Sequence, residues 1–468
     1  MNNKSRAFPF KIERSSINLF QWCLLLSGLI TNYISYNSMM PIIVTVGLLC
    51  LMQLILKVIK VIDSKESQFI NQIFLVGFLA GGISAFYRKI LKDDNQLTSD
   101  PNFFFQEAIR NDYFENAQLF LEHAIPLITW GFGYELLTSF EFEKDQYVGI
   151  SINISLVTLS SVFAIKTLYL IVGKEQYHLQ RLKILISSSL MIYLFSSVHL
   201  RDAFILLNIS IIMHAWTNYL KENTCLYKGV QAVVTSIVSA FVFDYLRDEF
   251  ILMPLIFSIM AITTLIVIKF YHNHKNKTSF FKLFIIFVAV MILVKFSYEI
   301  MNEYYSNYLA MIAGRANSDS LGYSLIVDQP LLVRLILGSI YLFVFPIPFW
   351  TGFQLNSVYH LYKSVNAVQF YFLIPLIFVL ITNLFTKKYF LKPEIIFLFL
   401  IMIGSSMAIS ITSLETRHFG AFFMGIFILA SVPDLRLEKD KWIFKISCIV
   451  TLGMVAVIHI AWIIIKYP

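Results

Sequence analysis

The chain consists of many separate apolar runs, each about as long as a helix that crosses a lipid bilayer. A transmembrane helix needs about 20 predominantly apolar residues, so a chain built from such runs has to fold in a membrane. Composition agrees, because 57% of the 468 residues are hydrophobic and only 14% are charged. We therefore predict one all-α, polytopic membrane domain over residues 1–468, with roughly 13 transmembrane helices. The strongest runs cover residues 17–36, 41–59, 70–86, 147–171, 184–198, 203–220, 230–245, 250–270, 281–298, 368–384, 395–411, 419–432 and 446–465.

Two further apolar stretches, residues 119–140 and 331–349, do not fit as full spans. Counting either as a span disturbs the charge pattern of the connections that follow it. We predict that both are interfacial or re-entrant helices. The polar segments before them, residues 88–118 and 299–330, are the longest connections in the chain and are predicted to be outer loops.

The basic residues indicate how the chain is oriented. If the N-terminus is cytoplasmic, 23 of the 37 Lys and Arg residues fall in cytoplasmic connections, as the positive-inside rule expects. These inner segments contain 4 Arg and 19 Lys, whereas the rest of the chain contains 7 of each. Lysine therefore accounts for the orientation, and the outer arginines call for a different explanation.

Three of the outer arginines stand where one apolar run ends and the next begins: Arg201, Arg247 and Arg417. An arginine near the membrane interface is costly unless it is paired or hydrated, so three at comparable depth suggest a shared anionic partner. A phosphate group fits best, because planar guanidinium groups bind its oxygens in bidentate pairs. Arg315, in the polar turn 314–320, is a fourth candidate. The simpler interpretation is that each arginine extends to lipid headgroups by itself.

Two of these arginines belong to a short repeat, because Leu-Arg-Asp occurs at residues 200–202 and again at 246–248. Each copy precedes an apolar run, so Asp202 and Asp248 are predicted to cap helices through the exposed amides of the first turn. A cation gains nothing from that position, which favours ligand binding as the role of Arg201 and Arg247.

A glycosyl transfer from a lipid diphosphate would use these residues in a specific way. The diphosphate leaves, so the cations that bind it also stabilise the negative charge that develops in the transition state. A base has to accept the proton of the acceptor hydroxyl, and the outer candidates are His418, Asp100 and Glu415, followed by Glu249 and His199. The alternative interpretations are an interfacial histidine without a chemical role and, for Asp100 before Pro101, an ordinary turn.

Other ligand classes have little support in the sequence. The four cysteines share no spacing, and His272 and His274 lie among lysines in a predicted cytoplasmic loop, so we expect no metal site and no cofactor. The net charge of +8 follows from the orientation of the chain and does not indicate nucleic-acid binding.

Several of these features together resemble a family. They are the acidic aromatic segment 100–105, the Leu-Arg-Asp starts at Arg201 and Arg247, the turn 314–320 followed by residues 346–350, and the late pair Arg417 and His418. In combination they resemble the Wzy-type O-antigen or capsule polymerases and the related GT-C-fold lipid-sugar glycosyltransferases. The resemblance implies a bacterial inner-membrane enzyme with a periplasmic active site. It also implies that undecaprenyl-diphosphate-linked glycans are the substrate, that Asp100 or His418 activates the acceptor, and that a chain-length regulator is a partner.

Three functions remain open at this point. The first is an inverting, metal-independent polymerase of oligosaccharide repeat units. The second is a GT-C-type transferase with a polyprenyl-phosphate sugar donor, in which Asp100 is the base and a divalent ion takes part; the modest length of the outer loops favours it. The third is a flippase for lipid-linked sugars, which would place charges near the middle of the membrane on broken helices.

Overall fold

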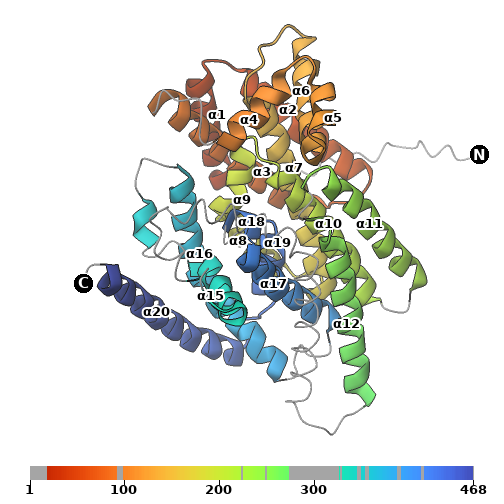
Figure 1. Ribbon diagram of the computed structural model, residues 1–468, viewed down its shortest axis with the longest axis vertical. Helices are drawn as coiled ribbons and strands as arrows, with labels where there is room; N and C mark the ends of the chain where they lie inside the picture. Colours follow the sequence, from red (N-terminus) through yellow and green to blue (C-terminus); the bar gives the residue numbers. More distant parts are fainter. Residues whose placement is uncertain are drawn as a thin grey trace, which may run out of the picture.

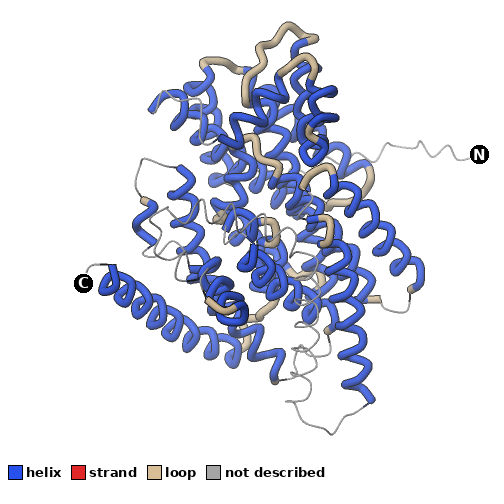
Figure 2. The backbone as a smooth tube through the Cα atoms, in the orientation of Figure 1, coloured by secondary structure: helices blue, strands red, loops and turns tan. Residues whose placement is uncertain are grey.

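The computed structural model describes residues 18–91, 99–222, 225–247, 250–273, 326, 329–344, 349–353, 358–386, 392–412 and 416–466. These residues form helices and connecting turns, and no β-strand occurs among them (Figure 2). The predicted all-α class is confirmed for this part of the chain.

Among the residues that the structure describes, eight helical segments are long and apolar enough to cross a membrane. The eight lie in α2 (Met40–Val58), α3 with its π-helical extension η1 (Ser64–Leu91), α7 (Tyr147–Val172), α10 (Asp202–Lys221), α11 (Leu226–Asp244), α16 (Val358–Phe385), α17 (Pro393–Thr412) and α20 (Glu438–Lys466). The other long helices are α1 (Leu19–Tyr36), α12 (Met253–Asn273) and α15 (Leu331–Val344).

These helices differ in how much of their surface the protein covers. In α3 and α7, 72% of the most apolar window is buried, whereas the corresponding values are 22% for α2 and α11 and 17% for α20. The difference matches their positions, because α3 and α7 lie inside the bundle and α20 runs along its edge (Figure 1). The exposed faces of α2, α11 and α20 are apolar, as expected for surfaces that contact lipid.

Two predicted spans are interrupted in the structure, which is one reason why the prediction of 13 spans is not confirmed. The run 184–198 divides at Ser188 into α8 (Gln176–Ser187) and α9 (Leu190–Ser197). The run 419–432 divides into α18 (Thr416–Gly420) and α19 (Phe423–Ser431). The two broken helices pack against each other, α9 on α18 and α8 on α19. Backbone breaks of this kind are tolerated within a membrane where protein or a hydrated cavity surrounds them.

The predicted loop 88–118 is mostly helical. After α3 ends in η1 (Tyr87–Leu91), the chain forms α4 (Ser99–Ile109), α5 (Tyr113–Leu119), the 3-10 turn η2 (Leu121–His123) and α6 (Ala124–Thr138). α6 and α15 have 15 and 14 residues, fewer than a perpendicular span needs. That 119–140 and 331–349 are interfacial or re-entrant stays a prediction. Most of the second predicted loop, 299–330, lies outside the described residues.

Candidate functional site

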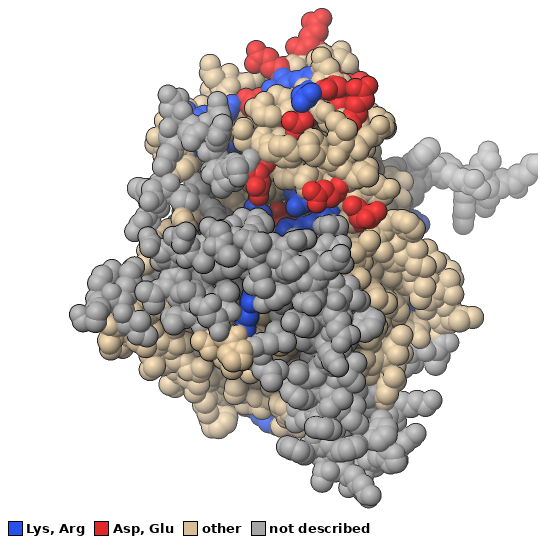
Figure 3. Space-filling model, viewed as in Figure 1, with Lys and Arg blue, Asp and Glu red and all other residues tan. Residues whose placement is uncertain are grey.

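A cavity of about 200 Å³ lies where α4, η2, the start of α10 and α18 meet. Its lining combines two cations, two carboxylates, a histidine and apolar side chains, and we call it the arginine cavity: Asp100, Phe103, Phe104, His123, Leu200, Arg201, Asp202 and Arg417. In Figure 3, acidic and basic side chains gather in a band across the middle of the viewed face. The structure thus unites residues that lie more than 300 positions apart in the chain.

Arg417 is held between two carboxylates. Its Nη1 and Nη2 donate to Oδ2 of Asp100 at 3.4 and 3.3 Å, and its Nε lies 3.9 Å from Oδ1 of Asp202. These distances are long for charge-assisted hydrogen bonds, which normally measure about 2.7–2.9 Å. The Asp100 side chain is 49% exposed, so a competing anion could replace it on Arg417.

Arg201 joins the two Leu-Arg-Asp segments to each other. Its Nη1 donates to the carbonyl oxygen of Leu246 at 3.0 Å and to Nδ1 of His123 at 2.6 Å. The pKa of His123 is lowered by burial and by the neighbouring Arg201, which keeps the imidazole neutral and able to accept this hydrogen bond. Because Arg247 follows Leu246 directly, this contact brings the second arginine of the repeat close to the first.

Arg247 itself is buried, with only 7% of its surface exposed. Its guanidinium lies 5.8 Å from the ring centroid of Phe250, and that ring stacks on Phe422 at a centroid distance of 6.4 Å. Phe422 lies two residues after the end of α18, so the aromatic pair joins the second Leu-Arg-Asp segment to the helix that carries Arg417.

His418 shows how closely these cations are gathered. Burial lowers its pKa well below the ordinary value, and so do four cations: Arg247, Arg417, Arg201 and Lys363. The four come from α10, α16, α18 and the turn after α11. Around His418 the leading electrostatic effects are therefore all positive, and its imidazole stays neutral near pH 7.

Asp202 was predicted to cap α10, and that prediction is wrong. Arg201 occupies the N-cap position, Asp202 is the first helical residue, and no side-chain cap hydrogen bond forms. Asp202 is only 3% exposed and points its Oδ1 towards Arg417 instead. The charge pairing with a distant helix therefore prevails over the local cap.

His199, one of the weaker base candidates, does not line the cavity. Its Nε2 lies 2.7 Å from the hydroxyl of Tyr134, and the two rings are stacked. Burial and the cation of Arg88 lower its pKa to about 3. These contacts assign His199 a packing role. The candidates Arg315, Glu415 and Glu249, and the predicted cap Asp248, lie outside the described residues.

Two contributors to the cavity region escaped the sequence analysis. His123 follows Glu122 inside a stretch that we judged by its apolar residues, and Lys363 precedes the apolar run that begins at residue 368. Each is a single polar residue next to an apolar run. The sequence shows that such a residue is present, but it does not show which distant residues it will contact. Among the described residues, no group of three or more His, Cys, Asp or Glu side chains could hold a metal ion.

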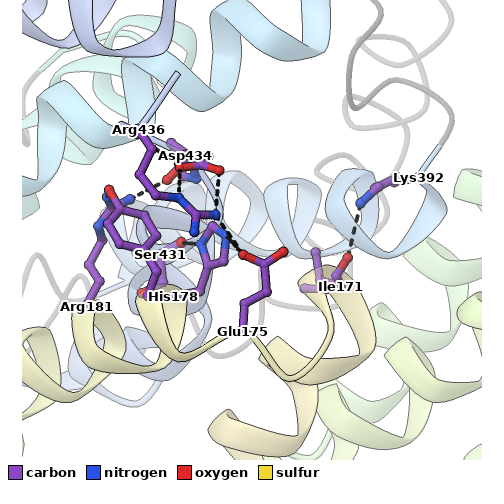
Figure 4. A network of polar contacts seen from close by, with 10 residues as sticks. Ile171, Glu175, His178, Arg181, Lys392, Ser431, Asp434 and Arg436 are labelled. Atoms are coloured by element: carbon purple, nitrogen blue, oxygen red, sulfur yellow. Dashed lines mark hydrogen bonds and ion pairs between the residues drawn. The ribbon is translucent and has the colours of Figure 1, made fainter. Parts of the chain in front are cut away.

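A second charged group, the Arg436 cluster, lies where α8 begins and α19 ends (Figure 4). Arg436 donates to Asp434 and to Glu175, with Nη2 at 2.7 Å from each, and its Nε donates to Asp434 at 2.8 Å. His178 bonds the carbonyl oxygen of Ser431 through Nδ1 at 2.7 Å. The two broken helices connect this cluster to the arginine cavity.

No protein-family model, curated protein or solved structure matched the chain when it was compared with each of these. The functional argument therefore depends on the residues and the geometry of this chain.

Proposed function

We propose that the chain is a membrane glycosyltransferase, a polymerase that transfers a growing glycan from its undecaprenyl diphosphate to the next lipid-linked repeat unit. One observation carries the proposal: Arg201 and Arg417, from distant parts of the chain, line one cavity together with two carboxylates, and Arg201 bonds the backbone of Leu246, the residue before Arg247. Convergent guanidinium groups suit a diphosphate, which has several closely spaced anionic oxygens. The bacterial inner membrane and a periplasmic location of the site are part of the same proposal.

The contacts of Arg417 suggest how binding and proton transfer are coupled. In the structure Asp100 accepts hydrogen bonds from Arg417. A diphosphate would take over these donors and release the Asp100 carboxylate, which then accepts the proton of the acceptor hydroxyl. The glycosidic carbon bonds to the acceptor oxygen as its bond to the diphosphate oxygen breaks, and Arg201, Arg247 and Arg417 stabilise the departing charge. His418 and Glu415 are the other candidate bases.

The proposal is tested by the surface glycan of a deletion strain. The strain is complemented with wild type, Arg247→Ala or Arg417→Ala, and the glycan is resolved by length on a gel. We expect deletion to leave a single repeat unit, and we expect both variants to fail to restore the ladder at normal membrane levels. A ladder of normal length that lacks one sugar would replace the proposal with the single-sugar transferase.

One observation favours a second candidate, a flippase for lipid-linked sugars. Both broken helices, α8 with α9 and α18 with α19, adjoin the arginine cavity, and discontinuous helices are frequent at the substrate sites of transporters. In the same strain, a flippase would leave lipid-linked units on the cytoplasmic leaflet after deletion. A polymerase would leave them on the periplasmic leaflet.

A further inference from the structure

An apolar groove of about 390 Å³ runs between α10 and α11, next to the arginine cavity. Its walls are mainly apolar side chains from the first half of α10 and the second half of α11: Ile125, Phe204, Leu207, Asn208, Ile211, Val234, Thr235, Val238, Ser239, Val242 and Leu246. The two helices lie side by side in Figure 1.

Two chain segments line both the groove and the cavity, and a third joins them through a hydrogen bond. In η2 and α6, His123 lines the cavity and Ile125 lines the groove. In α10, Asp202 lines the cavity and Phe204 lines the groove. Leu246 lines the groove with its side chain, and its carbonyl oxygen accepts the hydrogen bond from Arg201. The groove therefore begins within one helical turn of the cationic site.

The length and the chemistry of the groove fit a hydrocarbon chain. From Val234 to Val242 it follows eight residues of α11, about 12 Å at a rise of 1.5 Å per residue. The hydrocarbon of one leaflet is about 15 Å thick, half of a typical bilayer core. The polar pair at its floor is already satisfied, because Ser239 Oγ donates to Asn208 Oδ1 at 2.9 Å and Asn208 Nδ2 donates to the Ser239 carbonyl oxygen at 3.3 Å. The Asn208 and Ser239 side chains would therefore keep their hydrogen bonds when an apolar ligand lies in the groove.

We infer that this groove binds the first isoprene units of a polyprenyl diphosphate whose head group lies in the arginine cavity. The inference rests on the proposed function for the identity of the head group, and it adds the position of the tail. A groove that ends at convergent guanidinium groups selects an anionic lipid with a single chain at its head. A phospholipid would have to place two acyl chains there.

The test uses two tryptophan variants on α11 with different positions relative to the groove. Val238 lines the groove and is 55% exposed, whereas Ile237 is 53% exposed and lies outside it. In the full chain reconstituted in nanodiscs, the affinity for undecaprenyl diphosphate and for isopentenyl diphosphate is measured. We expect Val238→Trp to weaken binding of the long lipid at least about tenfold by excluding several methylene groups from the groove. Binding of the five-carbon ligand should stay unchanged, and Ile237→Trp should match wild type for both ligands.

Two results would overturn the inference. One is equal binding of undecaprenyl diphosphate to the two tryptophan variants. The other is displacement of that lipid from wild type by phosphatidylglycerol at similar concentration, which would make the groove a general lipid contact. Neither measurement involves turnover. Groove binding as expected, together with a normal glycan ladder in the deletion strain, would reject the polymerase and keep the lipid site. Equal lipid binding by the two variants, together with loss of the ladder in the deletion strain, would reject the lipid site and keep the polymerase.

Discussion

The arginine cavity and the Arg436 cluster contain the same kinds of groups but use them differently. In the Arg436 cluster, one guanidinium has two carboxylate partners at 2.7 Å, and the pKa of Asp434 falls to about 2 because Arg436 donates to it. In the cavity, Arg417 meets its two carboxylates at 3.3 and 3.9 Å. Both clusters terminate the same pair of broken helices.

This contrast bears on the proposed function. A short ion pair such as that of Arg436 holds two helix ends together and leaves little for a ligand to gain. If the arginine cavity binds a diphosphate, as proposed, the anion would reduce the repulsion among the cations gathered there. The predictions below test this distinction with matched substitutions in the two clusters.

The largest effect is expected from removing one guanidinium at each place. Arg417→Ala should lower glycan polymerisation by at least about 100-fold, the usual cost of deleting a donor to developing negative charge. Arg436→Ala should leave polymerisation near wild type and lower the melting temperature slightly, because Arg436 and its partner Glu175 are about half exposed. Gel analysis of the glycan and thermal unfolding of the purified chain measure these effects. Equal loss of activity in both variants would remove the distinction.

The carboxylates provide the next comparison. Asp100→Asn keeps an acceptor for Arg417 but cannot accept a proton, so we expect polymerisation to fall about 100-fold, as for loss of a general base. Binding of undecaprenyl diphosphate should be retained, because the substitution weakens a competitor for Arg417. Asp434→Asn should change neither property. If Asp100→Asn polymerises normally, the base is another residue, with His418 as the first candidate.

A smaller effect should follow from exchanging arginine for lysine. Arg201 donates through Nη1 to the carbonyl oxygens of Leu246 and Glu122 and to Nδ1 of His123, and it lines the arginine cavity. Arg201→Lys retains the charge but loses bidentate geometry, so we expect about tenfold weaker binding of undecaprenyl diphosphate. Arg436→Lys should bind the lipid like wild type. Full affinity in Arg201→Lys would show that charge alone suffices.

The sequence predicted the helical class, most of the long spans and the gathering of Arg201, Arg247 and Arg417. Hydrophobic length is a local property, and the arginines were recognisable because each interrupts a long apolar run. The breaks at Ser188 and between α18 and α19 were not predictable, since both segments are as apolar as a continuous span. Whether such a segment breaks depends on the neighbours that surround it, and those neighbours come from distant parts of the chain.

The same limit applies to the site. Asp202 has the sequence signal of a cap, yet a carboxylate gains more from Arg417 than from the amides of its own helix. In the sequence, Lys363 and His123 are only single polar residues next to apolar runs, because it is the packing of α16 and η2 that brings them to the arginines. The partners of these side chains therefore depend on contacts between distant segments, which local sequence patterns do not reveal.

The smallest expected effect concerns two histidines, the partly exposed His418 near the cavity and the buried His178 in the Arg436 cluster. Burial lowers both pKa values below the ordinary value, so below about pH 6.5 the unfolded chain takes up protons that the folded chain does not. Each histidine should then lower the free energy of unfolding by up to about 1.4 kcal/mol per pH unit on acidification, and His418→Gln or His178→Gln should remove its share. Thermal unfolding between pH 5 and 7 measures both slopes.

A diphosphate should distinguish the two histidines. An anion bound among the arginines favours the charged form of His418 and raises its pKa, so the stability lost on acidification becomes smaller. His178 has no such neighbour, because its cluster lies at the other ends of the broken helices. Adding isopentenyl diphosphate should therefore reduce the acid sensitivity of wild type and His178→Gln more than that of His418→Gln. An equal reduction in all three proteins would mean that the anion binds away from His418. The proposal that the arginine cavity is the diphosphate site would then be rejected.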